Sequence, residues 1–398
     1  MSAVKIDLNN LDKSNWKTYR FDEVAKNISE RVDPNNTDLK VYIGLEHIDS
    51  ESLHITRHGT PDDVNGQKLK FYKGDIIFGR RRAYQRKAGI ATTDGFCSAH
   101  ALVLRANSEV IDPKLFPFFM HSDLFMNRAV DISVGSLSPT INWGTLKLQE
   151  FVIPPKEIQA ELSELLWSID LMVQKDIDAY LKYKIFYKRY LYDSVSGKKS
   201  ANFGDWKEHV FGDLGQTYGG LSGKTKKDFG KGEPFITYMN VFSNSKIDVN
   251  VVDYVNIQPG ENQKAVKYGD ILITGSSETP NELGMAAVIL DDLEGYYLNS
   301  FCFGFRLDNF KVLLPDYARH LMHGELVRNF MFKHAQGSTR FNLSKTTLKD
   351  KLILKIPSID EQKKISKILD SMIERQILFD QKIKSMDKLK LKLINQVF

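Results

Sequence analysis

The stretch VGSLSPTINWGTLKLQEFVIPP at residues 134–155 returns as QGSTRFNLSKTTLKDKLILKIP at residues 336–357. The two stretches share a Gly-Ser pair and the spacing of their apolar residues at a shift of 202 residues, and a final Ile-Pro at a shift of 203. Three other pairs of matching segments occur, and all four pairs follow the same order in both halves of the chain. The shift drifts only slightly between the matches, so we interpret the chain as a tandem duplication of one unit.

The other matches lie on both sides of this stretch. NWKTYRFDEVAKNI from Asn15 returns as DWKEHVFGDLGQTY from Asp205, and YKGDIIFG from Tyr72 returns as KYGDILIT from Lys267. PPKEIQAELSELL from Pro154 returns as PSIDEQKKISKIL from Pro357. A period near 200 residues is far too long for a solenoid repeat, so each copy is expected to fold as a domain.

Each copy begins with short apolar runs and ends in a helical pattern. Runs such as DIIFG, ALVLR and DILIT are bounded by Gly, Asp and Asn, which predicts short strands joined by loops. One helix per copy is expected over DPKLFPFFMHSDLFMNRAVD and LPDYARHLMHGELVRNFMFKH. A long helix without internal Pro or Gly then closes each copy, from about residue 156 to 192 and from Ser358 to the C-terminus. Ser358 and Glu361 have the spacing of a capping box.

The two long helices carry apolar residues at heptad spacing. The second has a seam at Ile365, Leu369, Met372, Phe379, Ile383, Met386, Leu393 and Val397. The first has Leu162, Ile169, Tyr183 and Tyr190 alternating with Ile158, Leu165, Met172, Ala179 and Phe186. This pattern predicts an antiparallel coiled coil, and packing of each helix on its own domain is the alternative.

The expected fold is therefore α+β with a pseudo-two-fold internal repeat. Two similar domains of short strands and helices, residues 1–153 and 200–356, are expected to be separated by two long helices that form an antiparallel coiled coil. The helical regions are residues 154–199 and 357–398.

Composition limits the function. The chain has 398 residues, 42% hydrophobic and 26% charged, which excludes a largely disordered protein. The net charge of +5 permits an anionic partner without requiring one. Two cysteines, one per copy, and the lack of a long apolar run predict a protein of the reducing cytoplasm with no membrane partner.

The strongest local charge signal follows the strand DIIF. The stretch from Lys68 to Ile90 holds eight basic residues against Asp75 alone. Arginine forks mixed with an amide and an aromatic ring are suited to contact phosphates and guanine edges, whereas a solvated basic loop is the alternative. The predicted DNA-contacting residues of this copy are Arg80, Arg81, Arg82, Tyr84, Gln85, Arg86 and Lys87.

In the second copy the corresponding loop, TGSSETPNELG, is polar and nearly neutral. Basic residues gather instead in SGKTKKDFGKG. Similar domains with divergent loops are expected of one fold that reads two different ligands. The predicted DNA contacts of this copy are Lys224, Lys226, Lys227, Ser276, Ser277 and Arg340.

No catalytic or metal centre is visible in the sequence. GGLSGKT around Lys224 lacks the first glycine of a phosphate-binding loop, because that position is Tyr218. His320 and His323 have a spacing that could bind a metal on a helix, but no Cys or carboxylate completes the set. An Asn-Pro-Pro-aromatic motif, which an adenine methyltransferase needs to hold a flipped base, is also missing.

These marks together resemble the specificity subunit of a type I restriction-modification system. The resemblance rests on the entry segments at Trp16 and Trp206, on YIGLEHID and FITYMNVF, on the two GD-apolar strands, and on the exits IPPKEIQ and IPSIDEQ. It covers nearly the whole chain and occurs twice. The second exit has a single Pro followed by Ser where the first has Pro-Pro. This difference is expected to change the cap of the helix and not the role of the helical region.

The resemblance implies a non-catalytic subunit with two target recognition domains. Each domain would read one half of a bipartite double-stranded DNA target, and the helices would fix the gap between the halves. Two methyltransferase subunits would dock on it, with restriction subunits, and these partners would carry S-adenosylmethionine, ATP and Mg; none is expected in this chain. Trp167, Leu181, Ile185 and Ile373 are candidates for the docking surface, with burial against the domains as the alternative.

Three alternatives remain open at this point. They are a specificity subunit of a type IIB restriction enzyme, a catalytic DNA nuclease or methyltransferase, and a structural coiled-coil scaffold.

Overall fold

The computed structural model describes residues 11–197 and 206–398. Two compact units divide the chain: residues 1–178 together with 380–398, and residues 179–379. The predicted domain boundary at 199/200 lies outside the described residues. The long helices α5 (Lys156–Val195) and α10 (Ile359–Val397) each contribute to both units.

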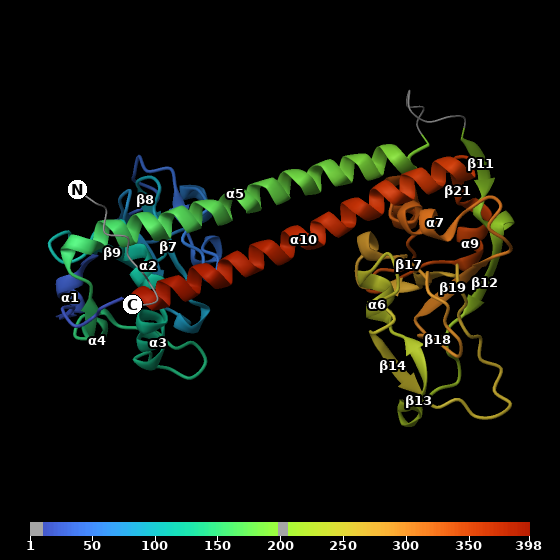
Figure 1. The fold of residues 1–398 in the computed structure, drawn as a ribbon, viewed down its shortest axis with the longest axis horizontal. Coiled ribbons are helices and arrows are strands. Elements are labelled where there is room, and N and C mark those ends of the chain that lie inside the picture. The colour runs from blue at the N-terminus through green and yellow to red at the C-terminus, as the bar shows by residue number, and fades with distance from the viewer. Residues whose placement is uncertain (1–10, 198–205) are drawn as a thin grey trace. The chain divides into compact units, whose positions relative to one another are not determined.

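The remaining elements of the first unit are short (Figure 1). They are β1 (Lys17–Arg20), α1 (Phe21–Val24), β2 (Ala25–Ile28), β3 (Arg31–Val32), β4 (Tyr42–Ile43), β5 (Lys68–Phe71), β6 (Ile76–Gly79), β7 (Ala88–Ile90), β8 (Gly95–Cys97), β9 (Ala101–Ala106), α2 (Phe116–His121), α3 (Asp123–Asp131), α4 (Trp143–Leu146) and β10 (Glu150–Ile153).

The second unit repeats most of this order. Its elements are β11 (Lys207–Val210), β12 (Gly215–Gly219), β13 (Phe229–Ile236), α6 (Tyr238–Ser243), β14 (Val252–Val255), β15 (Ile271–Thr274), β16 (Ser276–Ser277), β17 (Ala286–Val288), β18 (Tyr297–Leu298), β19 (Cys302–Leu307), α7 (Pro315–Leu321), α8 (Glu325–Lys333), β20 (Phe341–Asn342), α9 (Lys345–Lys351) and β21 (Ile353–Ile356).

The sheets confirm the internal repeat. A four-stranded antiparallel sheet has the order β2-β9-β6-β7 in the first unit and β12-β19-β15-β17 in the second. Beside it, each unit has a sheet with one parallel pair, β4 with β8 and β13 with β18. The ladders β1–β10 and β11–β21 join the entry segment of each copy to its exit. The fold is therefore α+β and duplicated, as predicted.

An ion pair between a buried carboxylate and a partly exposed arginine explains the repeated Gly-Asp of the central strands. Asp75 accepts two hydrogen bonds from the Arg105 guanidinium at 2.7 and 2.9 Å, and Asp270 accepts two from Arg306 at 2.8 and 2.6 Å. Both carboxylates are 1% exposed. Each arginine lies on the strand that pairs with the central strand, so the ion pair ties the turn before that strand to the sheet. Removing either carboxylate would leave the guanidinium of Arg105 or Arg306 without its ion-pair partner and destabilise the domain.

Two glutamines fix the starts of the long helices. The side-chain carbonyl of Gln159 accepts the N–H of Asp112 at 2.6 Å, and that of Gln362 accepts the N–H of Leu314 at 2.8 Å. Both side chains are buried, and their amide groups donate to nearby carbonyls. The repeated glutamine in IPPKEIQ and IPSIDEQ thus attaches each helix to its own domain.

The predicted capping box is confirmed. The Ser358 N–H and hydroxyl donate to the Glu361 carboxylate at 3.1 and 2.8 Å, and the Glu361 N–H donates back to the Ser358 hydroxyl at 3.4 Å. These contacts satisfy donors at the start of α10 that have no intrahelical partner.

The prediction of a single helix after the central strands of each copy is wrong. Each unit has two helices there, α2 and α3 or α7 and α8, because the residue directly before the second helix is extended. Ser122 has φ −65° and ψ 150°, and its hydroxyl accepts the Phe125 N–H, so it caps α3. Gly324 has nearly the same backbone angles before α8.

Within each unit the two long helices lie side by side and antiparallel (Figure 1). In the first unit Lys382 pairs with Asp176 at 2.8 Å. In the second, the Phe379 ring lies 5.9 Å from Tyr180 and 5.6 Å from Tyr183, measured between centroids. The predicted α10 seam is confirmed, since its residues are all buried or partly buried.

The seam predicted for α5 is only half right. Met172 and Phe186, which belong to the predicted seam, are 55% and 58% exposed. Leu166 and Val173 each follow a predicted seam residue directly, and both are fully buried. Leu165, Leu166 and Trp167 are three consecutive large apolar residues, so heptad spacing alone does not choose among them.

A polar cluster interrupts the seam and attaches the helices to the domains. In the first unit Asp170, 1% exposed, accepts from Lys390 at 3.3 Å and lies 2.6 Å from His54. Burial alone would raise the pKa of Asp170, but His54 and Lys390 hold it below its usual value. In the second unit a residue at a different position makes such a contact: Asp370 of α10, which matches Trp167 at the helix shift of 203, lies 2.7 Å from the His320 ring.

Each unit has its own aromatic-rich core on the sheet, to which the helices contribute. Leu162 and Leu166 of α5 and Ile394 of α10 join the first core, while Ile365 and Leu369 of α10 join the second. None of the helices in the described ranges is long and apolar enough to cross a membrane.

Candidate DNA-recognition sites

The basic loop of the first unit is held by a hairpin that projects beside β6. The hairpin spans residues 134–140 and turns at Gly135, whose φ of 119° disfavours any residue with a side chain. Arg81 and Thr140 form a β-bridge, and the Arg82 N–H donates to the Pro139 carbonyl at 2.7 Å. The loop is therefore fixed in place rather than merely solvated.

The predicted residues of this loop divide into two groups. Arg81, Arg82 and Tyr84 are exposed, whereas Arg80 and Gln85 are partly buried. The Arg81 Nε donates to the Ser138 hydroxyl at 2.8 Å. Neither Arg81 nor Arg82 forms an ion pair within the described residues, so both guanidinium charges are available to an anionic partner.

Arg86 and Lys87, also predicted to contact DNA, have partners within the first unit. The Arg86 guanidinium donates to Asp123 at 2.6 Å and lies 3.5 Å from Glu51, and the Lys87 ammonium donates to the Leu45 carbonyl at 2.6 Å. Both side chains are partly buried. They shape the loop, and we leave them out of the proposed DNA surface.

In the second unit the same two elements meet as β16 and β20, with Ser276 opposite Asn342 and Ser277 opposite Phe341. Ser276 and Ser277 are each only 7% exposed, but Arg340 is exposed at the hairpin tip. One Arg340 N–H donates to the Ser276 hydroxyl at 3.2 Å, and its guanidinium carbon lies 5.0 Å from the Phe301 ring centroid.

An open cavity of about 730 Å³ lies beside this arginine. Aromatic and sulfur side chains form part of its wall, and two carboxylates, Glu278 and Glu282, form another part. The Tyr238 hydroxyl, also on the wall, donates to the Ser276 carbonyl at 2.9 Å. Phe301 is 54% exposed. The cavity thus combines flat apolar surfaces with both charge signs.

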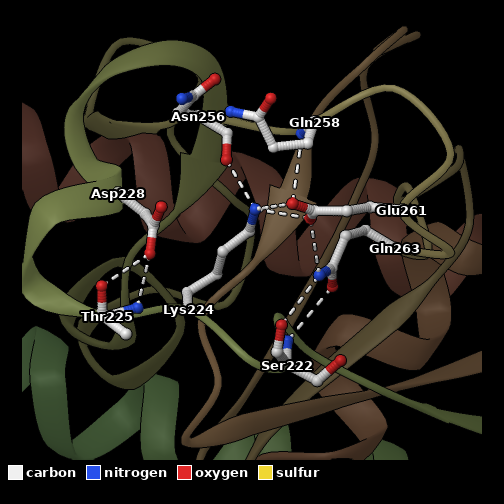
Figure 2. Close-up of polar contacts among 8 residues, drawn as sticks. All are labelled: Ser222, Lys224, Thr225, Asp228, Asn256, Gln258, Glu261 and Gln263. Carbon is white, nitrogen blue, oxygen red and sulfur yellow. Dashed lines mark hydrogen bonds and ion pairs between the residues drawn. The ribbon is translucent and has the colours of Figure 1, made fainter.

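The lysines of the second basic segment, from residue 222 to 231, differ in exposure. The Lys224 side chain is 5% exposed, and its ammonium donates to the Asn256 carbonyl at 2.6 Å and to Glu261 at 2.7 Å (Figure 2). Lys224 therefore joins two loops and is not a surface contact. Lys226 and Lys227 are exposed, on a turn that Thr225 and Asp228 close at 2.7 and 2.8 Å (Figure 2).

The histidines considered as metal ligands have other partners. The His323 Nε2 donates to the Ala286 carbonyl at 2.7 Å, and His320 pairs with Asp370. No group of three or more potential metal-ligating side chains occurs in residues 11–197 and 206–398.

The candidate docking residues on the helices differ in exposure. Leu181 and Ile185 of α5 are 52% and 70% exposed in the second unit. Ile373 of α10 is partly buried. Trp167 is packed on its own domain, with its ring 5.0 Å from that of Phe118 and its N–H donated to the Lys114 carbonyl.

The comparison with known families decides the identity. The domain described as the type I restriction modification DNA specificity domain matches this sequence twice, at residues 13–182 and 204–386. The chain belongs to this family. The two matches follow the duplication seen in the sequence and in the sheets.

Curated relatives of this family match part of the chain. The type I restriction enzyme EcoDI specificity subunit of Escherichia coli is 30% identical over 151 residues, which is 37% of this chain and 33% of that protein. The HindI specificity subunit of Haemophilus influenzae is 22% identical over 163 residues, 39% of this chain and 36% of that protein. This chain thus matches about a third of the length of each relative.

Solved structures of type I systems share the fold along the whole chain. A chain from a structure described as the basis of complex assembly and conformational transition of the type I R-M system has a TM-score of 0.63 at 18% identity, covering 96% of this chain and 97% of that one. The type I S subunit from M. genitalium has a TM-score of 0.54 at 14% identity, covering 99% and 98%.

Sequence reasoning missed three side chains of these sites: Ser138, Tyr238 and Phe301. Ser138 could have been found, because it lies opposite Arg340 when the two hairpin sequences are aligned at the shift of 202. Tyr238 and Phe301 come from separate segments, and only the folded chain brings them to Ser276.

Proposed function

We propose that this chain is the DNA-reading subunit of a type I restriction-modification complex. The target recognition domains, residues 1–153 and 200–356, each bind one half of a bipartite duplex target. The helical regions, residues 154–199 and 357–398, set the gap between the halves and bind two methyltransferase subunits, to which restriction subunits are added. The complex works in the cytoplasm.

One observation carries this proposal: the same strand-and-hairpin frame occurs twice and presents different exposed side chains. Arg81, Arg82 and Tyr84 stand on it in the first unit, and Arg340 stands on it in the second. Arginine is suited to both phosphates and guanine edges. Two similar frames that present different side chains are suited to bind two different half-sites. A purely structural scaffold would not need this difference.

The chain itself supplies no chemistry in this proposal. S-adenosylmethionine, ATP and Mg belong to the partner subunits. The exposed Leu181 and Ile185 of α5 are the part of the helical pair best suited to hold a partner through apolar contact. A type IIB specificity subunit would use the same DNA-reading surfaces, and the two systems differ in the partners.

A methyl-transfer assay tests the division of labour. We expect the purified chain alone to transfer no labelled methyl group to any duplex, and the methyltransferase subunit alone to show no sequence preference. The two together should methylate a gapped target. Methyl transfer by the pure chain would contradict the proposal. So would an equal sequence preference of the methyltransferase subunit with and without the chain.

A further inference from the structure

The two units share one backbone junction beside the central strand. In the first, the Ile141 N–H donates to the Arg80 carbonyl at 2.9 Å. In the second, the Leu343 N–H donates to the Gly275 carbonyl at 3.0 Å. Arg81 then bridges Thr140, and Ser276 bridges Asn342. The central strands correspond at a shift of 195 residues and the hairpins at 202, so these are matching positions.

An arginine and a serine meet across this junction in both units, with their places exchanged. In the first unit Arg81 is on the strand side and donates from Nε to the hydroxyl of Ser138 on the hairpin at 2.8 Å. In the second unit Ser276 is on the strand side and accepts from Arg340 on the hairpin at 3.2 Å. Position 81 matches 276, and position 138 matches 340.

Each junction therefore holds one exposed arginine in a defined orientation. The serine hydroxyl engages one N–H of the guanidinium and leaves the others without a protein partner within the described residues. In the second unit the guanidinium also lies over the Phe301 ring, and the Tyr238 hydroxyl donates to the backbone carbonyl of Ser276. A fork fixed in this way loses little freedom when it binds a planar ligand.

The charge around Arg340 favours a base edge over a phosphate. Glu278 and Glu282 line the cavity beside it and would repel a phosphate, whereas a carboxylate can accept the amino group of a cytosine. The exposed Phe301 ring adds an apolar surface of the kind that contacts thymine methyl groups.

We propose that the junction arginine, Arg81 in the first domain and Arg340 in the second, reads a guanine in its own half-site. Two N–H groups of the fork donate to O6 and N7 of the guanine in the major groove. The junction serine, Ser138 or Ser276, is a positioning residue that orients the fork. This inference rests on the proposed function, because it names a base within the target that the function assumes.

Exchange of the pair is the decisive test. We would measure binding of the full chain, with its methyltransferase partner, to duplexes that carry every base at each half-site position. Arg81→Ser should lower the preference for one guanine of one half-site by about 5- to 150-fold and leave the other half-site unchanged. Arg340→Ser should do the same in the other half-site.

The double variant Arg81→Ser, Ser138→Arg should restore much of the lost preference, because the arginine returns to the junction from the other side, as it does in the second unit. Arg81→Lys and Arg340→Lys keep the charge without the fork, so they should retain DNA binding with a weaker guanine preference than the arginine gives. The matched control, Lys226→Ala with Lys227→Ala, should weaken all sequences alike and reduce the salt slope by about two.

Two results would overturn the inference while leaving the proposed function intact. One is equal weakening of all sequences by Arg81→Ser and Arg340→Ser with a smaller salt slope, which would identify phosphate contacts. The other is an unchanged guanine preference in both serine variants. If the wild-type complex shows no sequence preference at all, the proposed function itself fails.

Discussion

Inserting one heptad into each long helix should lengthen the gap between the two methylated half-sites by up to about three base pairs. Seven residues add about 10 Å to a helix, and duplex DNA rises about 3.4 Å per base pair along each strand. Suitable sites are after Asp178 in α5 and after Phe379 in α10. A full heptad keeps both seams in phase.

These positions leave the contacts within each unit untouched. Asp176 and Lys382 pair in the first unit, and Tyr180 packs on Phe379 in the second. The half-site sequences should therefore stay the same while the gap changes, with some loss of activity because the longer gap also rotates one half-site. Mapping methylated bases reads both properties.

The control is a heptad in α5 alone, which puts the two helices out of register and should abolish methylation of the gapped target. An inserted protein that folds and methylates with the original gap would show that the helices do not set the spacing.

Lowering the pH from about 6.5 to 4 should remove about 3 kcal/mol of folding free energy for each of two histidines, the buried His121 and the partly buried His323. His121 and His323 occupy matching places, and each donates from Nε2 to a strand carbonyl, of Ala88 at 2.6 Å and of Ala286 at 2.7 Å. Burial lowers the pKa of each to about 4.

The sign follows from proton binding. Between pH 4 and 6.5 an unfolded histidine is protonated while these two remain neutral, so the unfolded state binds more protons and the free energy of unfolding falls as the pH falls. Above pH 6.5 the contribution is constant. His320, whose pKa burial also lowers, adds to the same trend.

Urea unfolding at a series of pH values measures this effect. The double variant His121→Gln, His323→Gln keeps a donor near each carbonyl but does not titrate, so its stability should depend on pH much less steeply. A wild-type stability that is flat over this range, or equal slopes in wild type and variant, would contradict the assignment.

Much of the fold could be predicted because the duplication doubles every signal. The shared Gly-Asp, the paired glutamines and the apolar strands each mark a contact that both units make, such as Asp75 with Arg105 and Asp270 with Arg306. Heptad spacing located both long helices. Heptad spacing placed one of the two α5 seam lines wrongly because Leu165 and Leu166 are equally apolar. In the folded chain Leu166 is the one that is buried against the domain.

The sites were less predictable because charge in a sequence does not reveal its partners. Lys224 and Arg86 belong to basic runs, yet each pairs with a carboxylate that is distant in sequence, Glu261 and Asp123. The arginine–serine exchange was also hidden, since a substitution of Arg81 by serine at position 276 looks like the loss of a charge. Only the folded junction shows that Arg340 replaces it.

The most direct test of the central claim is a map of methylated bases in a host that expresses this chain with its methyltransferase partner. We predict one asymmetric motif with two short half-sites, each containing a guanine, and a gap of fixed length and free sequence. A contiguous motif, or a methylation pattern that does not change when the chain is removed, would contradict it.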